Sequence, residues 1–336
     1  MSSEATIDHD EFLAASRAAV SASTGSDALD ALGWWDLLGL LDDPEARAAT
    51  YALFRAHGRE LGDSVALGAL AAAPYADAAD GSDAADGSDG SDGSDARTVM
   101  AFARTSPTRG TAFTLLGAPT AADRILVDPG PAAGNPVVLD RAAVELRPVA
   151  IPGRLTVHDV VVPAGAGIPV APVAGLAAAR ARSAFVARVA AAYEILGAAE
   201  GAFALALDHA NGRVQFGQPI GTFQAVRHLL AWAVTDTRAI ESVADVARDL
   251  DADAPPRFDE IVKALAGRNG RRACERSLQV LGAIGFTAEL DHHHFHSRVL
   301  TLDAVAGTSS ELATALGAWV RAERPDPGIA AAVLGA

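Results

Sequence analysis

Cysteine, lysine and aromatic residues are scarce in this 336-residue chain, and acidic residues outnumber basic ones. Cys274 is the single cysteine, so no intrachain disulfide can form and a secreted scaffold held together by disulfides is excluded. Lys263 is the only lysine, and together with abundant alanine it indicates the amino-acid bias of a GC-rich genome rather than a functional requirement.

Long hydrophobic runs and an excess of basic charge are also missing. No uninterrupted apolar run reaches ~18 residues, the length that spans a membrane, so we expect no membrane-spanning helix and no membrane partner. The first residues are acidic and lack the hydrophobic segment of a signal peptide, so the cytoplasm is the expected location. The formal net charge of -15 argues against nucleic acid as a partner.

The first quarter of the chain predicts helices followed by a linker. Half of all residues are hydrophobic, enough for the cores of two or three domains. Residues 1–75 predict an N-terminal helical domain, because apolar side chains such as Phe12, Ala15 and Val20 recur at helical spacing. Residues 76–96 repeat glycine, serine and aspartate and predict a flexible Gly/Ser/Asp-rich linker, in which metal binding is disfavoured because no rigid frame holds the aspartates.

The remaining residues predict a β-domain and then a helical bundle. Short β-type runs separated by Gly and Pro turns indicate a small, reduced β-domain over residues 97–170, with strands near 98–103, 124–128, 136–140, 144–149 and 155–162. Residues 171–336 predict a four-helix bundle with short connections, with helices at 173–211, from Pro219 to 251, at 258–284 and from Thr308.

The turn between the first two bundle helices carries a cation, an aromatic ring and polar groups. Asn211 and Gly212 predict the end of one helix, and Pro219 predicts the start of the next. Between them, the Arg213 guanidinium suits a phosphate and the Phe216 ring offers a face for a heterocycle. By itself this pattern favours an ordinary packed turn over a nucleotide site.

From Arg213 to His228, however, the order of residues closely resembles the acyl-CoA dehydrogenase family of flavoenzymes. The resemblance implies an α+β fold with an N-terminal helical domain, a central β-domain and a C-terminal four-helix bundle. It also implies that this turn reaches the pyrophosphate and adenine of the FAD held by a neighbouring subunit. The residues at the matching positions are Arg213, Gln215, Phe216, Ile220, Phe223 and Gln224.

Two further stretches are similar to the same family. Residues 279–289 resemble a glycine-rich family stretch in which Gln279 and Gly282 approach the FAD, with Ala283 replacing a second glycine. Thr308 lies in a Gly-Thr-Ser string that the resemblance also places at the cofactor.

The residue that would act as catalytic base is missing. In the family a glutamate removes the α-proton of an acyl-CoA thioester while the β-hydrogen leaves as hydride to the flavin. The usual position of that glutamate is Ala306 here, and an alternative family position falls near Ala187. Asp303 and Glu311 flank Ala306 and are weak candidates for a relocated base.

Other parts of the usual site are absent or displaced. Glu194 and Glu200 lie too far along the first bundle helix to replace the base. The family loops that hold the flavin ring are not found in the β-domain, where residues 104–110 are the only loop-like candidate and no tryptophan occurs. The subunit is therefore not expected to hold a flavin ring by itself.

The histidines from His292 to His296 invite a metal interpretation. The family commonly has an acidic residue and a histidine at this point, so we expect no metal there. His228 also matches the family turn, and we expect it to be structural.

Taken together, these features favour an accessory subunit of a heteromeric acyl-CoA dehydrogenase, similar to the short subunits of α2β2 actinobacterial enzymes of steroid and acyl-CoA catabolism. The resemblance implies FAD shared with a full-length partner subunit, an acyl-CoA substrate, and electron-transfer flavoprotein or a similar acceptor. Two alternatives stay open. One is a self-sufficient homo-oligomeric dehydrogenase with Asp303 or Glu311 as the base, and the other is a non-redox member of the fold that binds a CoA ester.

Overall fold

The computed structural model describes residues 16–18, 20, 29–30, 32–80, 97–106, 110–163, 168–169 and 175–324. Phe12 and Ala15 of the first helical pattern lie outside the described residues, as do residues 81–96 of the predicted linker.

Helices form the N-terminal part, as predicted. They are α3 (Trp34–Leu38), α4 (Pro44–Glu60) and α5 (Ala66–Asp80). The start of α4 is well specified, because Pro44 occupies its first position and the Asp43 carboxylate accepts a hydrogen bond from Ala46 N. The backbone of α5 stays helical to Asp80, five residues into the predicted linker.

The central part is a seven-stranded sheet with the strand order β5-β6-β2-β1-β3-β4-β7. Its strands are β1 (Thr98–Ser106), β2 (Gly110–Leu116), β3 (Arg124–Val127), β4 (Val137–Asp140), β5 (Glu145–Pro148), β6 (Val157–Val161) and β7 (Ile168–Pro169). Among the strands that the structure describes, β1 and β3 pair in parallel and the other neighbouring pairs of this sheet are antiparallel.

The sequence interpretation missed β2 and took residues 104–110 for a loop. In the structure Arg104 lies within β1, and Ser106 pairs with Gly110 at the start of β2. Residues 107–109 lie outside the described residues. The described part of residues 104–110, the candidate loop for holding a flavin ring, is therefore the end of a β-hairpin.

The C-terminal part contains α6 (Leu176–Gly212), α7 (Gln224–Leu250), α8 (Phe258–Leu281), α9 (His292–Asp303) and α10 (Ser309–Glu323). The prediction that Pro219 opens a helix was wrong. Pro219 belongs to a small hairpin of β8 (Val214–Gln215) and β9 (Gln218–Pro219), and the 3-10 turn η2 (Ile220–Thr222) precedes α7. Phe216 and Gly217 both have positive φ, which is the backbone of a two-residue hairpin loop.

Two other helix predictions also need correction. The third bundle helix ends at Leu281 rather than at residue 284, because Gly282 has a φ of 64° and begins the 3-10 helix η4 (Gly282–Phe286). The short helix α9 was not among the predicted bundle helices.

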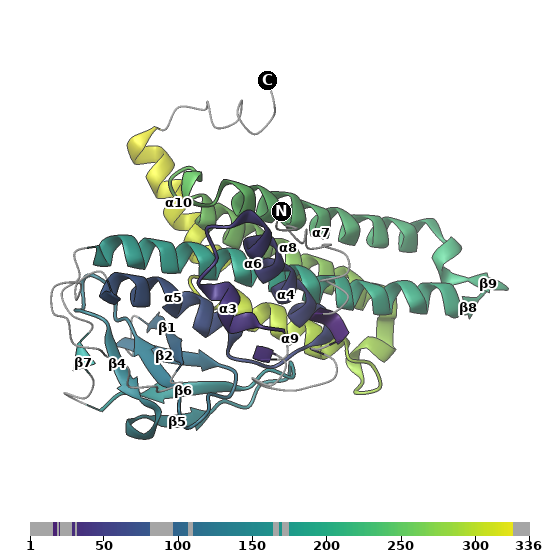
Figure 1. Cartoon of the computed structure of the whole chain (residues 1–336). Helices are drawn as coiled ribbons and strands as arrows, with labels where there is room; N and C mark the ends of the chain where they lie inside the picture. Colours follow the sequence, from purple (N-terminus) through teal and green to yellow (C-terminus); the bar gives the residue numbers. More distant parts are fainter. Residues whose placement is uncertain are drawn as a thin grey trace, which may run out of the picture.

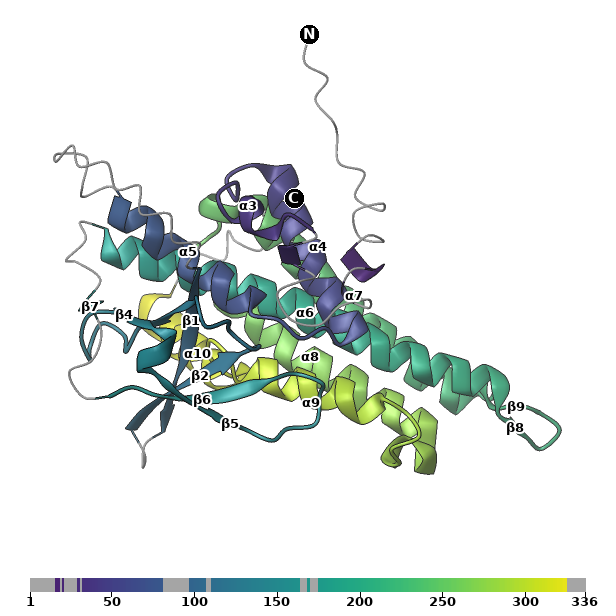
Figure 2. The same cartoon turned by 60° about the horizontal axis from the view of Figure 1, so that its bottom comes forward.

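Helix α6 lies at the centre of the molecule. In Figure 1, α5 and α6 lie between the sheet on one side and α7 and α8 on the other, and Figure 2 shows the same layers from below. Helix α6 contacts α4, α5, α7, α8 and α9, and most of its residues from Val186 to Ala202 are buried. The hydrophobic core therefore forms around this one helix.

Within the described part of the chain, α6 is also long and apolar enough to cross a membrane by length and composition alone, where the sequence interpretation expected no such helix. Because 78% of its most apolar window is buried inside the protein, the apolar side chains are covered by the surrounding helices.

Candidate functional site

The β8-β9 hairpin projects from the end of the bundle where α6 gives way to α7 (Figures 1 and 2). Backbone hydrogen bonds hold its base, since Arg213 N donates to His209 O at 2.8 Å and Ile220 N donates to Arg213 O at 2.8 Å. The Phe216 side chain is 93% exposed at the tip. Its ring meets the Phe223 ring edge-on, with centroids 6.1 Å apart.

This geometry suits a nucleotide that is covered from its other side. The Arg213 side chain is exposed and makes no ion pair within the described residues. A free guanidinium beside an exposed phenyl ring offers one contact for a phosphate and one for a heterocycle. Since the hairpin stands clear of the rest of the chain, the second wall of such a site has to come from another molecule.

The other residues predicted for this turn lie around the same hairpin. Gln215 is exposed, and its amide donates to Val214 O at 2.7 Å. Ile220 is partly buried in η2, and Gln224 is exposed in the first position of α7.

A small apolar cluster brings the second predicted stretch to the same end of the bundle. It consists of Ala206 and Ala210 of α6 with Val280 and Leu281 of α8, and Ile220 and Val226 pack against it. Exposed Gln279 and the positive-φ Gly282 are therefore at the hairpin end of the bundle, and their predicted contact with FAD stays a prediction.

The loop of Ala306 lies toward the other end. Lys263, near the start of α8, donates to Asp303 O at 3.0 Å and to Gly307 O at 3.2 Å. Gln279 is 16 residues further along α8, which corresponds to about 24 Å along the helix axis. Within one chain, the Arg213 turn and the position predicted for the base are therefore not brought together.

Cations from two helices hold the backbone of this loop. Arg188 Nε of α6 donates to Ala306 O at 3.0 Å, and Arg188 also pairs with Asp259 at 2.6 Å. Lys263 is fully buried, and its pKa falls to about 8 chiefly because burial disfavours the charged amine, with the nearby Arg188 charge adding to the effect and Asp303 opposing it. In the sequence, Lys263 was interpreted only as a feature of composition. The one signal that could have drawn attention to it is that it is the only lysine.

The two candidate replacement bases cap α10. The Asp303 carboxylate accepts hydrogen bonds from Ser309 N and Ser309 Oγ, both at 3.0 Å. Glu311 accepts from Thr308 N at 3.0 Å and from the Thr308 hydroxyl at 2.8 Å, forming a capping box. Thr308, predicted to contact the cofactor, therefore has its hydroxyl engaged at the start of the helix.

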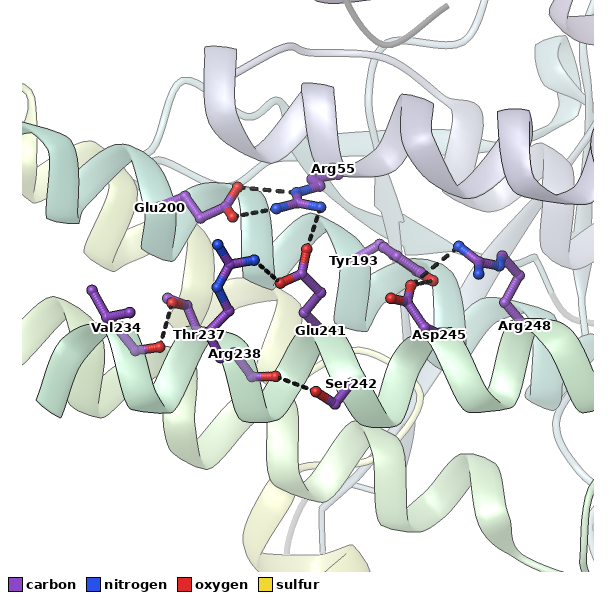
Figure 3. Close-up of polar contacts among 10 residues, drawn as sticks. All are labelled: Arg55, Tyr193, Glu200, Val234, Thr237, Arg238, Glu241, Ser242, Asp245 and Arg248. Carbon is purple, nitrogen blue, oxygen red and sulfur yellow. Dashed lines mark hydrogen bonds and ion pairs between the residues drawn. The ribbon is translucent and has the colours of Figure 1, made fainter. Parts of the chain in front are cut away.

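The two glutamates of α6 also have structural partners. Glu194 is buried and accepts from Arg298 Nε of α9 at 2.8 Å. Figure 3 shows Arg55 of α4 between Glu200 of α6 and Glu241 of α7. Arg55 forms an ion pair with each of them, and its distance to the Glu241 carboxylate is 2.8 Å. These ion pairs join helices and leave neither glutamate of α6 as a free base.

A cavity of about 600 Å³ lies between α8, α9 and α10, next to the Ala306 loop. It is lined by Arg268, Arg271, Asp303, Ser309, Ser310 and apolar side chains such as Leu265 and Leu300. Its size suits a small-molecule ligand, and its two guanidinium groups suit a phosphate.

The histidines of α9 make structural contacts. His292 Nε2 lies 2.9 Å from Cys274 O, and Gly153 N donates to His294 Nδ1 at 3.0 Å. In the part of the chain that the structure describes, no group of three or more His, Cys, Asp or Glu side chains is arranged to hold a metal.

Comparison with known proteins gives the class. Residues 174–320 match the family described as Acyl-CoA dehydrogenase, C-terminal domain. Over 223 residues, 65% of this chain, the sequence is 32% identical to acyl-CoA dehydrogenase FadE34 of Mycobacterium tuberculosis, and the match covers 29% of FadE34.

Two solved structures align over nearly their whole chains. The ChsE4-ChsE5 complex of Mycobacterium tuberculosis aligns at 18% identity with a TM-score of 0.67, over 96% of this chain and 99% of that chain. A variant of the Tcur3481-Tcur3483 steroid ACAD aligns at 20% identity with a TM-score of 0.66, over 94% of this chain and 98% of that chain.

The fold is thus that of the acyl-CoA dehydrogenases, with the predicted order of helices, sheet and helical bundle confirmed. Residues 174–320 match the C-terminal domain of the acyl-CoA dehydrogenase family, and the chain as a whole has the fold of that family.

Proposed function

We propose that this chain is the accessory subunit of a heteromeric, FAD-dependent acyl-CoA dehydrogenase. In this arrangement it contributes the adenine and pyrophosphate side of a FAD site whose flavin ring and catalytic base belong to a full-length partner subunit. The observation that carries the proposal is the exposed pair Arg213 and Phe216 at one end of the bundle. The loop far from this pair has Ala306 at the position where the resemblance expects the catalytic glutamate.

The residues present fit one side of the cofactor. Arg213, which has no ion pair among the residues that the structure describes, and the exposed Phe216 ring provide the two contacts that a dinucleotide needs at its adenosine end. When bound, FAD accepts the hydride from the β-carbon of the thioester. Arg213 would hold the pyrophosphate and Phe216 would lie against the adenine, so this chain orients the cofactor while the partner's base takes the α-proton.

The comparisons support a heteromeric enzyme and suggest a substrate class. Both of the aligned solved structures carry paired protein names, and one of them is described as a steroid ACAD. The proposed substrate is an acyl-CoA thioester, with a steroid side chain or a fatty acyl group as the acyl part. Electron-transfer flavoprotein or a similar acceptor would reoxidise the flavin, and the cytoplasm is the proposed location.

The test is flavin absorption in the purified protein. The chain is expressed alone and together with each full-length acyl-CoA dehydrogenase encoded in the same gene cluster. A flavin band is expected only in a co-purified complex. Arg213→Ala should weaken FAD retention by about 10-fold or more, because a charge-assisted phosphate contact is lost.

Arg124→Ala is the matched control, since Arg124 is an exposed arginine of the β-domain. A flavin band in the chain purified alone would contradict the accessory role.

The cavity beside the Ala306 loop supports a second candidate, in which the chain binds FAD or a CoA ester by itself. The engagement of Asp303 and Glu311 as helix caps argues against a relocated base. Isothermal titration of the isolated chain with FAD and with octanoyl-CoA separates the possibilities. Binding of either ligand, abolished by Arg268→Ala, would favour this candidate over the accessory role.

A further inference from the structure

The segment between β5 and β6 lies against α9 and so joins the sheet to the helical bundle. It runs from Val149 to Thr156, and a hydrogen bond from Val149 N to Val157 O at 2.8 Å closes its base. At its tip, Gly153 is buried and has a φ of 133°. A Cβ at Gly153 would lie 3.4 Å from Arg298 N of α9. The backbone of this tip is therefore in direct contact with the helix.

Two polar contacts hold the tip to α9, and we call them the clasp. Gly153 N donates a hydrogen bond to His294 Nδ1 at 3.0 Å, and the Arg154 guanidinium pairs with Asp291 at 2.9 Å. The side chains of the ion pair are 55% and 44% exposed, so water screens their attraction and the pair contributes little. The hydrogen bond between Gly153 and His294 is therefore the contact that keeps the clasp closed.

This hydrogen bond requires a neutral His294 ring. A neutral imidazole has one nitrogen that accepts a hydrogen bond, whereas both nitrogens of the protonated ring carry a hydrogen. A proton on Nδ1 would remove the acceptor and bring one N–H against another. Because Gly153 is buried, its N–H would then have lost its partner at a cost in free energy.

The groups around His294 also favour the neutral ring. Burial lowers the pKa of His294 below 6.5, the charges of His293 and Arg154 act in the same direction, and Asp291 opposes them. His293 precedes it on α9, with 3.9 Å between the two ring centroids. When the segment leaves α9, the ring regains contact with water and its pKa returns toward 6.5. The open clasp therefore binds a proton more readily than the closed one, and acid favours opening.

We propose that His294 is a pH-sensitive switch that holds the β5–β6 segment on α9 at neutral pH and releases it on acidification. Below pH 6.5 the equilibrium constant for opening rises by about 10-fold for each pH unit, until the pH reaches the lowered pKa of the closed clasp.

The release is local, because both sides of the clasp are anchored elsewhere. Thr156 N donates to the Asp63 carboxylate at 3.0 Å, which holds the end of the segment next to β6. Arg298 of α9 is buried and donates to Glu194 of α6 at 2.8 Å, which holds the helix. The inference goes beyond the proposed function and does not depend on it.

Hydrogen exchange of the Gly153 amide reports the clasp directly, because exchange requires its hydrogen bond to open. The full-length chain is measured at pH 7, 6 and 5, and each rate is compared with that of an unstructured peptide. The protection of Gly153 should fall by up to about 10-fold for each pH unit below 6.5. Residues 98–103 of β1 should stay more protected than Gly153, since the segment opens without unfolding of the sheet.

Two substitutions separate the acceptor from its titration. In His294→Asn, the side-chain oxygen takes the place of Nδ1 and is not protonated in this range, so Gly153 should be equally protected at all three pH values. His294→Gln has no acceptor at that place, so protection should be about 10-fold lower at pH 7 and should not follow the pH. His296→Asn is the matched control and should behave as wild type, since His296 is a half-buried histidine of α9 whose ring contacts His292.

Protection of Gly153 that does not change with pH in the wild type, or that falls equally in His294→Asn, would overturn the inference. Nitrogen NMR of the His294 ring gives a check that needs no variant, and it decides the matter if the asparagine does not reach Gly153. The ring should carry its hydrogen on Nε2 at pH 7 and titrate below 6.5, together with the Gly153 amide. A hydrogen on Nδ1 at pH 7 would contradict the switch.

Discussion

Phe216 is a residue whose side chain contributes almost nothing to the fold of its own chain. It is 93% exposed and has a φ of 51°, a backbone region that a bulky side chain rarely adopts. A large apolar side chain at such a position costs stability without burying surface, so its presence is best explained by contact with another molecule.

The Phe216→Asn variant separates a role of the side chain in the stability of its own chain from a role in binding FAD. Asn followed by Gly is the preferred sequence for the two-residue hairpin loop, so urea denaturation of the isolated chain should find stability unchanged or raised by up to about 1 kcal/mol. The same variant should lose FAD from the complex. A clear drop in stability would mean that the ring packs against its own chain.

Among the helices, the close crossing of α4 and α6 determines how the N-terminal domain sits on the bundle. Gly58 and Gly197 face the opposite helix, and a Cβ at either position would overlap a backbone carbonyl of that helix. The Arg55 to Glu200 ion pair lies at the same crossing (Figure 3). Small residues allow the backbones to approach, and the charged pair then fixes their register.

Gly197→Ala should destabilise the protein by about 3 kcal/mol or more, because the two helix backbones must separate to admit a methyl group. Gly39→Ala is the control, since its Cβ would be 3.9 Å from the nearest atom, Asp36 O. Thermal unfolding of both variants checks the prediction, and equal melting temperatures would contradict it.

Across the whole molecule, a buried charged centre joins the N-terminal helices to the bundle. Arg298 of α9 is fully buried, contacts Glu194 of α6 and donates to Gly62 O after α4. Burial, with Arg298 as the second cause, lowers the pKa of His57 from 6.5 to about 3, while burial raises the pKa of Glu194. The interior thus holds His57 as a neutral ring.

The pH dependence of unfolding should report this centre. The pKa of His57 is 6.5 in the unfolded chain and about 3 in the folded chain. Between these two pH values, the unfolded chain binds a proton at His57 and the folded chain does not. The contribution of His57 to the free energy of unfolding is therefore fully present above pH 6.5. It falls by about 1.4 kcal/mol for each pH unit below that value. The raised pKa of Glu194 acts in the opposite direction, so the informative quantity is the difference between wild type and His57→Gln.

Urea denaturation at pH 7, 6 and 5 measures that difference. His57→Gln should lose less stability than wild type over this range. Parallel pH profiles for the two proteins would show that His57 is free to take up a proton in the folded state.

Most of the architecture could be predicted because it depends on local patterns. Apolar residues at helical spacing identified α4, α6, α7 and α8, and β-branched runs between Gly and Pro turns identified β1, β3, β4, β5 and β6. The errors arose where local signals were ambiguous. Pro219 is compatible with either the start of a helix or the end of a strand. The chain forms a hairpin there because Phe216 adopts the positive φ that a two-residue hairpin loop needs.

The chain's own sequence determined its resemblance to the acyl-CoA dehydrogenases, the order of helices, sheet and helical bundle, the Arg213 and Phe216 pair and the alanine at position 306, because each of these is a matter of residue identity and spacing. Only the tertiary structure decided that Arg213 has no ion pair among the described residues. It also decided that Asp303 and Glu311 serve as helix caps. The hydrogen bonds from Lys263 and Arg188 to the backbone of the Ala306 loop likewise depend on the tertiary structure. These facts depend on which distant side chains meet in space. A linear pattern does not specify such meetings, since they follow from how the helices pack around α6.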